Sequence, residues 1–231
     1  MAAGIEKVDW EGFTRRFRWE QGEHLAAIAP TGGGKTTVFS ELMPYRRYSI
    51  MLGTKPDDDL YRQIIRRHGF RRVETLAEAR SYDERILVWP QQQKLIKDTV
   101  LRQQAAFKET LNAIAVQKAW TVWVDEAKYI SEYLHLRGEL TYMLEQMRSV
   151  KSTIICGAQR PVSLPTATLA NSTHVFLAKS NRREDAKILA DVGGIDSRVV
   201  AETAKELERF EFIYIHTRGT ESRAIRTRVA R

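Results

Sequence analysis

The sequence predicts an α/β fold in which a central, mainly parallel β-sheet is flanked by helices and carries a C-terminal β-hairpin. Short, mostly apolar runs alternate along the chain with segments whose apolar residues recur at helical spacing, which is typical of parallel strands joined by helices. Of the 231 residues, 43 % are hydrophobic, so a substantial core can be buried. No repeat, low-complexity tract or linker interrupts the sequence, and one continuous domain over residues 1–231 is expected.

Six short apolar runs are the predicted strands. Runs this short favour strands over helices, and their nearly continuous apolar character suits a sheet that is covered on both faces. The runs are His24–Ala29, Tyr48–Leu52, Ile86–Trp89, Thr121–Val124, Thr153–Cys156 and Val175–Leu177.

The intervening segments predict helices. In Asp59–His68 the apolar residues share one face, aspartates stand at the start, and a glycine follows the end. Similar apolar stripes predict one helix from Lys94 to about Lys118 and another that ends near Arg148. These stripes are interpreted as core rather than as cofactor contacts.

The C-terminal part predicts a hairpin at the edge of the sheet. Two strand-like segments, Phe210–His216 and Arg223–Val229, are separated by the turn-like Thr217–Thr220. We therefore expect a core over about residues 24–177, followed by helices and the hairpin over about residues 178–231.

Charge and cysteine content limit the classes of function. The chain has 37 Lys and Arg against 29 Asp and Glu, a net charge of +8, which suits a polyanionic partner or, equally, a solvated basic surface. A single cysteine, Cys156, excludes an intramolecular disulfide framework and a cysteine-rich zinc site. No apolar stretch approaches the roughly 20 residues that cross a bilayer, so we expect a cytoplasmic protein without direct membrane insertion.

The glycine cluster after the first run has the pattern of a phosphate-binding loop, with Ala29 in place of the usual first glycine. Three consecutive glycines let backbone N–H groups turn toward phosphate oxygens, and the following helix points its positive dipole end at the same anion. In this pattern Lys35 contacts the β- and γ-phosphates and the Thr36 hydroxyl ligates Mg²⁺, which makes ATP and Mg²⁺ the expected ligands. The expected binding residues are Pro30, Thr31, Gly32, Gly33, Gly34, Lys35, Thr36 and Thr37.

Two acids follow the run Thr121–Val124 directly. An Asp at the carboxyl end of a strand can hold the water shell of Mg²⁺, and this is the role expected of Asp125. Because side chains alternate along a strand, Glu126 points elsewhere and can orient and deprotonate the attacking water. The alternative is that both acids only open the next helix, where negative charge is favoured. With the loop upstream, hydrolysis is the better interpretation.

A polar residue at the next strand tip completes the pattern. Gln159 follows the run Thr153–Cys156 and could bond the γ-phosphate or the water, although by itself it could be an ordinary loop residue.

In their order and spacing, these motifs resemble the FtsK–HerA superfamily of ring-forming, DNA-pumping ATPases, which includes viral genome-packaging ATPases. The resemblance extends from about His24 to Ile215 and includes the turn Gly53–Asp57, which carries a Lys near an acid. It implies a P-loop NTPase of the additional-strand, catalytic-glutamate (ASCE) type.

The resemblance also implies an arginine that reaches the site from the neighbouring subunit. Members of the superfamily carry it in a helix just before the Gln-bearing strand, and Arg148 matches that place; Arg160 is a second candidate. A guanidinium there offsets charge that develops on the transferred phosphoryl group. The alternative for Arg148 is a cation that the helix C-terminus favours.

A ring that moves DNA needs Lys and Arg facing its channel, where they contact phosphates without reading sequence. For each candidate the alternative is a solvated surface. The main candidates are Lys179, Arg182 and Arg183, and the others are the pairs Arg66–Arg67 and Arg71–Arg72 and the tail residues Arg223, Arg226, Arg228 and Arg231.

The expected function is an ATP-hydrolysing, homo-oligomeric ring that translocates double-stranded DNA, most specifically in viral genome packaging. A capsid portal or vertex protein is a candidate partner, and the host cytoplasm, a virion or a procapsid is the expected location. Two alternatives stay open. One is a conjugation or secretion ATPase of the same superfamily, and the other is a non-translocating P-loop kinase or nucleotide switch.

Overall fold

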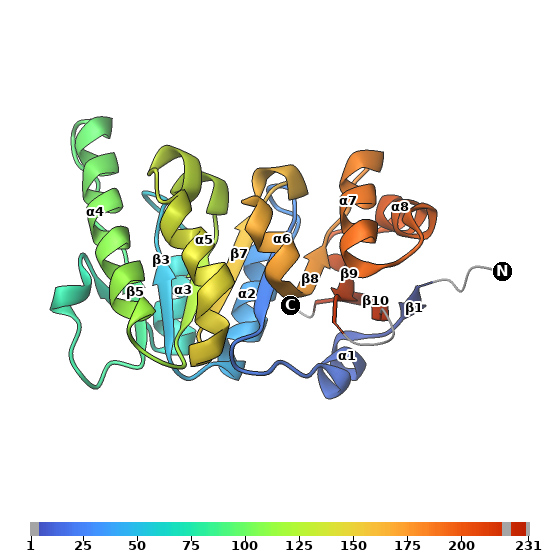
Figure 1. Cartoon of the computed structure of the whole chain (residues 1–231), viewed down its shortest axis with the longest axis horizontal. Coiled ribbons are helices and arrows are strands. Elements are labelled where there is room, and N and C mark those ends of the chain that lie inside the picture. The colour runs from blue at the N-terminus through green and yellow to red at the C-terminus, as the bar shows by residue number, and fades with distance from the viewer. Residues whose placement is uncertain (1–4, 219–222, 230–231) are drawn as a thin grey trace.

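One continuous sheet of ten strands organises the part of the chain that this computed structural model describes, residues 5–218 and 223–229 (Figure 1). Its strand order is β1-β10-β9-β8-β2-β7-β6-β3-β5-β4, and all neighbours are parallel except the pairs β10–β9 and β9–β8. The strands are β1 (Glu6–Lys7), β2 (His24–Ile28), β3 (Ser49–Leu52), β4 (Arg71–Val73), β5 (Arg85–Val88), β6 (Thr121–Val124), β7 (Thr153–Ala158), β8 (Ser172–Leu177), β9 (Glu211–His216) and β10 (Arg223–Arg228).

Helices cover both faces of this sheet and bury a separate apolar core on each (Figure 1). One face carries α4 to α8, and the other carries α1 to α3. The helices are α1 (Trp10–Arg16), α2 (Lys35–Leu42), α3 (Asp59–His68), α4 (Ile96–Ala115), α5 (Arg137–Gln146), α6 (Thr166–Asn171), α7 (Arg183–Gly193) and α8 (Ser197–Glu206). A π-helical turn, Tyr129–Tyr133, precedes α5, and short 3₁₀ turns include Met147–Val150 before β7.

Local sequence explains the helix ends. Helix α3 begins after Asp58, whose side chain accepts a hydrogen bond from the Leu60 N–H, and it ends at Gly69, which adopts φ +68°. Arginines in its last turn complement the helix dipole. The predicted helix from Lys94 to Lys118 is present as α4 and is shorter at both ends.

The predicted fold class is confirmed, with the six strands in place and a C-terminal antiparallel pair, β9–β10. Two strands were not predicted, because β1 and β4 span only two and three residues and are mostly polar. Strand β1 pairs with β10, so the hairpin extends the sheet without being its last strand. Of the predicted turn Thr217–Thr220, the last two positions lie outside the described residues.

The order of the central strands decides which loops meet. Strand β7 lies between β2 and β6, so one additional strand separates the strand before the glycine cluster from the strand that ends in the two acids. Because these strands are parallel, their carboxyl ends share one edge of the sheet, which we call the carboxyl edge. The site predicted from the sequence therefore gathers at that edge.

Candidate active site

The glycine cluster forms a tight loop between β2 and α2. Gly32 and Gly34 have φ values of +74° and +101°, a region that side chains with a Cβ rarely adopt. The Gly33 N–H donates to the Pro30 carbonyl at 2.8 Å, and a Cβ on Gly33 would lie only 2.9 Å from that oxygen. Gly32 and Gly34 are therefore favoured by their backbone conformation, and Gly33 by its close contact with Pro30.

This loop fits the phosphates of a nucleotide. The first N–H groups of α2 have no partner within the helix, and Gly34, its N-cap, has no side chain that could accept from them. These N–H groups and the helix dipole are the features that a phosphate-binding site uses. Half-buried Thr36 and Thr37 lie on the first turn, and exposed Pro30 and Thr31 flank the loop.

Lys35 connects the loop with the two acids that the sequence predicted. Its buried Nζ lies 3.4 Å from Oδ1 of Asp125 and 3.3 Å from Oε1 of Glu126, although about ninety residues separate the lysine from the acids. The side chain of Asp125 is fully buried, and its Oδ1 has no hydrogen-bond partner among the described residues. A buried carboxylate oxygen that pairs with Lys35 but accepts no hydrogen bond from the described residues fits a role in holding Mg²⁺ or its water shell, with the Thr36 hydroxyl as the second ligand expected from the loop pattern.

Lys55 also reaches the site; the sequence placed this lysine in a turn near an acid but gave it no role in the site. From the turn after β3, its Nζ lies 2.8 Å from Oδ2 of Asp125 and 2.7 Å from Oδ2 of Asp58. Burial opposes the charge of Lys55, but the negative charge and hydrogen bond of Asp125, together with Asp58, raise the pKa of Lys55 above its ordinary value. Lys55 is therefore a permanent cation that fixes one oxygen of Asp125.

Gly157 on β7 allows this close packing. A Cβ at this position would lie 2.5 Å from the backbone oxygen of Asp125 and 2.9 Å from Cδ of Lys35. Since β7 runs between β2 and β6, any larger residue would push the lysine and the acids apart. Only the strand order reveals this requirement.

Gln159 lies at the carboxyl edge, as predicted, directly after β7. Its exposed side chain lines a cavity of about 340 Å³ together with Pro30 of the loop. Arg160 lines the same cavity, but Nη2 of Arg160 lies 3.2 Å from Oδ1 of buried Asp185. Within its own subunit, Arg160 is thus engaged in an ion pair.

Glu126 borders a second cavity, of about 540 Å³, on the side of α4. Tyr129 and Tyr133 line it from the π-helical turn that follows the acids, with their rings stacked 5.3 Å apart. The Tyr129 hydroxyl donates to Oε1 of Gln103 at 2.7 Å, and Nε2 of Gln103 donates to the Thr54 carbonyl at 3.0 Å. These bonds tie the turn that carries Lys55 to the segment after Glu126.

Arg148 lies away from the loop of its own subunit. It belongs to the 3₁₀ turn before β7, and a Cβ on Gly22 would lie 3.1 Å from its backbone oxygen. Gly22 precedes β2, whereas the phosphate-binding loop follows the other end of that strand. Arg148 is therefore at the opposite, amino edge of the sheet. Its predicted action on a neighbouring subunit requires the amino edge of one subunit to approach the carboxyl edge of the next.

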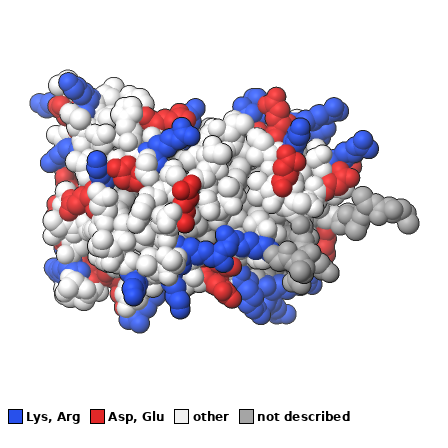
Figure 2. All heavy atoms as spheres, viewed as in Figure 1, with Lys and Arg blue, Asp and Glu red and all other residues white. Residues whose placement is uncertain are grey.

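Two groups of the predicted DNA-contacting residues differ in how free their charges are. Exposed Lys179 and Arg182 line the cavity that contains Gln159, and exposed Arg183 begins α7 beside them. In contrast, Arg226 and Arg228 of the basic tail form ion pairs with Glu211, and Arg231 lies outside the described residues. On the face drawn in Figure 2, basic and acidic groups are interspersed, and the area over α6 is mainly uncharged.

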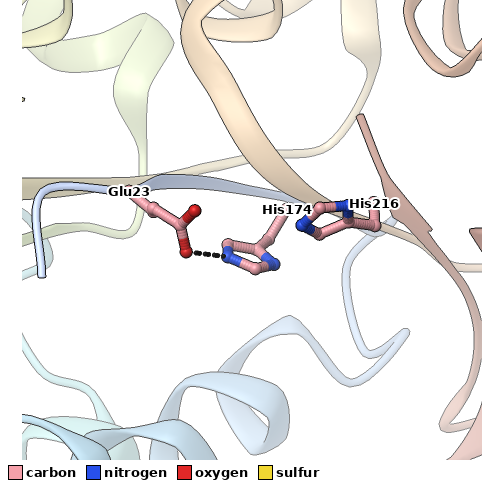
Figure 3. A group of neighbouring side chains, drawn as sticks. All are labelled: Glu23, His174 and His216. Carbon is pink, nitrogen blue, oxygen red and sulfur yellow. Dashed lines mark hydrogen bonds and ion pairs between the residues drawn. The ribbon is translucent and has the colours of Figure 1, made fainter. Parts of the chain in front are cut away.

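A second group of polar side chains lies near the amino edge. Glu23, His174 and His216 present possible metal-ligand atoms within 4.8 Å of one another (Figure 3). However, the ring nitrogens of His174 bond to Oε2 of Glu23 at 3.0 Å and to the Tyr214 hydroxyl at 2.8 Å. Burial lowers the pKa of His174, although Glu23 opposes that shift, so the ring is neutral at pH 7. This hydrogen-bonded chain fastens the segment before β2 to β8 and β9.

Fold and loop together define a P-loop NTPase with an additional strand next to the loop-bearing strand. No protein-family model matches the sequence, and a search of curated proteins finds no match either. Solved structures do match. The DNA-packaging ATPase B204 of Sulfolobus turreted icosahedral virus is 15 % identical, with a TM-score of 0.64 over 89 % of this chain and 98 % of B204.

Two further structures extend this likeness. The genome-packaging NTPase B204 of Sulfolobus turreted icosahedral virus 2, in complex with ATP-gammaS, is 13 % identical, with a TM-score of 0.59 over 90 % of this chain and 98 % of that one. The conjugation coupling protein TcpA of pCW3 is 12 % identical, with a TM-score of 0.53 over 88 % of this chain and 59 % of TcpA. At these identities the likeness is one of fold, and at that level the predicted resemblance to FtsK–HerA-type packaging ATPases is confirmed.

Among the described helices, none combines the length and the apolar character needed to cross a bilayer.

Proposed function

We propose that this protein is an ATP-hydrolysing motor that translocates double-stranded DNA, most specifically in viral genome packaging. The observation that carries the proposal is the position of Lys35, whose ammonium group joins the phosphate-binding loop to Asp125 and Glu126. A loop that binds phosphate, a buried acid and a half-exposed acid within one site are the parts that nucleotide hydrolysis requires. The fold shared with two packaging ATPases supports the choice of motor.

In the proposed reaction, the loop N–H groups hold the β- and γ-phosphates of ATP, and Lys35 neutralises them. Mg²⁺, held by Thr36 and, through water, by Asp125, would supply positive charge to the phosphate oxygens. Phosphates in the loop compete with both acids for Lys35, so the carboxylate of Glu126 is released to accept a proton from the attacking water. Gln159 orients that water or the γ-phosphate.

A neighbouring subunit would complete the site with an arginine, for which Arg148 is our assignment. In a ring, this arrangement makes hydrolysis depend on the contact between subunits, so that each turnover can move one subunit relative to the next. Arg160 is the weaker candidate because Asp185 already engages it in the same subunit.

The net charge of +8 and the exposed Lys179, Arg182 and Arg183 suit the phosphate backbone of DNA. We assign these three residues to contacts that do not read sequence. A capsid portal or vertex protein is the expected docking partner, and the motor would work in the host cytoplasm or on a procapsid.

A second candidate is an ATPase of a conjugation or secretion system. The likeness to TcpA, a conjugation coupling protein, favours it, and this chain covers only 59 % of TcpA. Such a protein would depend on a membrane partner for its activity, whereas a packaging motor would depend on DNA and a capsid.

ATPase turnover with and without duplex DNA, measured together with particle mass, tests the proposal. We expect turnover that DNA stimulates and a particle that contains several subunits. Lys35→Ala is the control that should abolish turnover. Phosphate transfer to a nucleoside or a metabolite instead of water would favour a kinase over the motor.

A further inference from the structure

The turn between α8 and β9 packs directly against the phosphate-binding loop. Phe210 in this turn adopts φ +66°, a conformation that is uncommon for residues other than glycine. A Cβ on Gly34 would lie 2.7 Å from Cδ1 of Phe210 and 3.3 Å from the ring of Phe212. The aromatic ring of Phe210 therefore lies against the last glycine of the loop, in a strained backbone position of the kind that concentrates at ligand sites.

Arg209 lies over this ring at the solvent side. Its guanidinium carbon is 4.8 Å from the centre of the Phe210 ring, and its Nε donates to the Gly32 carbonyl at 3.3 Å. Both residues thus contact glycines of the loop, and Arg209 is exposed. A guanidinium group is itself planar, so one that lies over an aromatic ring offers an exposed planar surface beside the loop.

The strand order indicates what this surface would contact. Strands β7 and β6, which carry Gln159 and the two acids, lie on one side of β2, and β8 and β9 lie on the other. If the γ-phosphate faces Glu126, as the proposed function requires, the nucleoside end of ATP must extend away from the acids. That direction leads toward β9 and the turn before it, where Arg209 and Phe210 lie.

We infer that Arg209 and Phe210 form the base-binding wall of the nucleotide site, where the guanidinium of Arg209 stacks on the purine. The phosphates would then contact the loop itself, and the base would contact the wall that packs against the loop. The contact between Arg209 and the Gly32 carbonyl keeps this wall in register with the phosphate site. The inference rests on the proposed nucleotide site and assigns the part of the substrate that the phosphate-binding loop does not contact.

Calorimetric titration with Mg²⁺-ATP and with Mg²⁺-tripolyphosphate, which has no base, tests the inference. We expect Arg209→Ala to bind ATP about tenfold more weakly and tripolyphosphate as tightly as the wild type. Arg209→Lys keeps the charge but not the planar surface, so it should lose nearly as much. Lys205→Ala, which removes one exposed positive charge from the end of α8, is the matched control and should bind both ligands normally.

A second variant guards against an indirect effect of folding. Phe210→Leu keeps an apolar side chain against Gly34 and removes the aromatic face, so ATP affinity should fall while tripolyphosphate affinity does not. Unchanged ATP affinity in Arg209→Ala would overturn the inference, as would an equal loss for ATP and tripolyphosphate. If Arg209→Ala weakens ATP binding alone but the wild type does not hydrolyse ATP, the proposed motor function is rejected and the base-binding role of Arg209 and Phe210 is retained. If the wild type binds neither ATP nor tripolyphosphate, both the proposed function and the base-binding role are rejected.

Discussion

Nζ of Lys55 lies 2.8 Å from Oδ2 of Asp125, while Nζ of Lys35 lies 3.4 Å from Oδ1 of the same carboxylate. One lysine at the start of α2 and one in the turn after β3 thus pair with the two oxygens of one fully buried acid. A carboxylate can remain ionised in such a position only if cations or hydrogen-bond donors compensate its charge. This arrangement holds the carboxylate of Asp125 in place before any nucleotide binds.

Replacement of Lys55 should therefore weaken both the fold and the site. We expect Lys55→Met to lower the free energy of unfolding by about 2 kcal/mol, because one oxygen of buried Asp125 loses its charged donor. ATPase turnover should fall at least tenfold. Urea denaturation and steady-state turnover measure the two effects.

Arg62→Ala is the control, since Arg62 pairs with exposed Asp57 and Asp59 on the same segment; its stability should change by no more than about 0.5 kcal/mol. A Lys55→Met protein as stable and as active as the wild type would contradict the role of Lys55.

The role of Glu126 in hydrolysis should be separable from nucleotide binding. Glu126→Gln keeps an oxygen near Lys35 but cannot accept the proton of water, so turnover should fall by about 10² to 10⁴ while ATP affinity stays within a few-fold. Single-turnover hydrolysis and equilibrium binding measure these quantities. Glu132→Gln, an exposed change in the nearby π-helical turn, should leave both unchanged. Substantial hydrolysis by Glu126→Gln would remove Glu126 as the base.

The position of Arg148 leads to a test of action between subunits. Arg148→Ala should lower turnover at least tenfold while nucleotide affinity and assembly stay near normal. Mixed with Lys35→Ala subunits, it should regain activity, because some sites then combine an intact loop with an intact arginine. Exposed Arg137, at the start of α5, provides the comparison. Rescue of Arg137→Ala without rescue of Arg148→Ala would reassign the role to Arg137.

His24 should make stability depend on pH. Burial, with a contribution from the positive charge of Arg148, lowers the pKa of His24 to about 4, and its Nδ1 accepts from the Ile154 N–H at 3.1 Å. The unfolded chain binds a proton at this residue below about pH 6.5, whereas the folded chain resists it until about pH 4. The contribution of neutral His24 to the free energy of unfolding is therefore fully present above pH 6.5 and is lost as the pH falls toward 4.

The measurement is the free energy of unfolding at pH 7.5 and at pH 5. His24→Asn keeps a hydrogen-bond acceptor but does not titrate, so its loss on acidification should be smaller than that of the wild type by about 2 kcal/mol. His135→Asn serves as the control, because His135 is exposed and its φ of +53° suits asparagine. If His24→Asn and the wild type lose the same free energy of unfolding between pH 7.5 and pH 5, His24 is excluded as the source of the pH dependence.

The affinity for DNA should fall steeply as the salt concentration rises and should not depend on the DNA sequence. Lys179→Ala and Arg182→Ala should each weaken duplex binding about equally on unrelated sequences and reduce the salt slope by about one unit. Arg228→Ala should have little effect, since Arg228 is already paired with Glu208 and Glu211. Fluorescence anisotropy at several salt concentrations measures this. A binding constant that does not change with salt concentration but does depend on the DNA sequence would contradict the proposed motor function.

The sequence by itself determined the parts of the site that are encoded locally. The glycines of the loop, the acids at the tip of β6 and Gln159 after β7 each follow an apolar run, and the carboxyl ends of parallel strands share one edge of a sheet. Alternation of strands and helices predicted that parallel sheet. Local pattern was therefore sufficient to place the phosphate-binding loop and the acids together.

Only the tertiary structure decided the contacts between segments that are distant in sequence. The bond of Lys55 to Asp125, the packing of Phe210 on Gly34 and the location of Arg148 at the amino edge all depend on strand order and on loop paths. Gly157 shows the same dependence, because its lack of a Cβ matters only once β7 lies between β2 and β6. The periodicity of apolar residues indicates which face of a helix or strand is buried, but not which other element packs against that face. The contacts named here depend on which elements pack together.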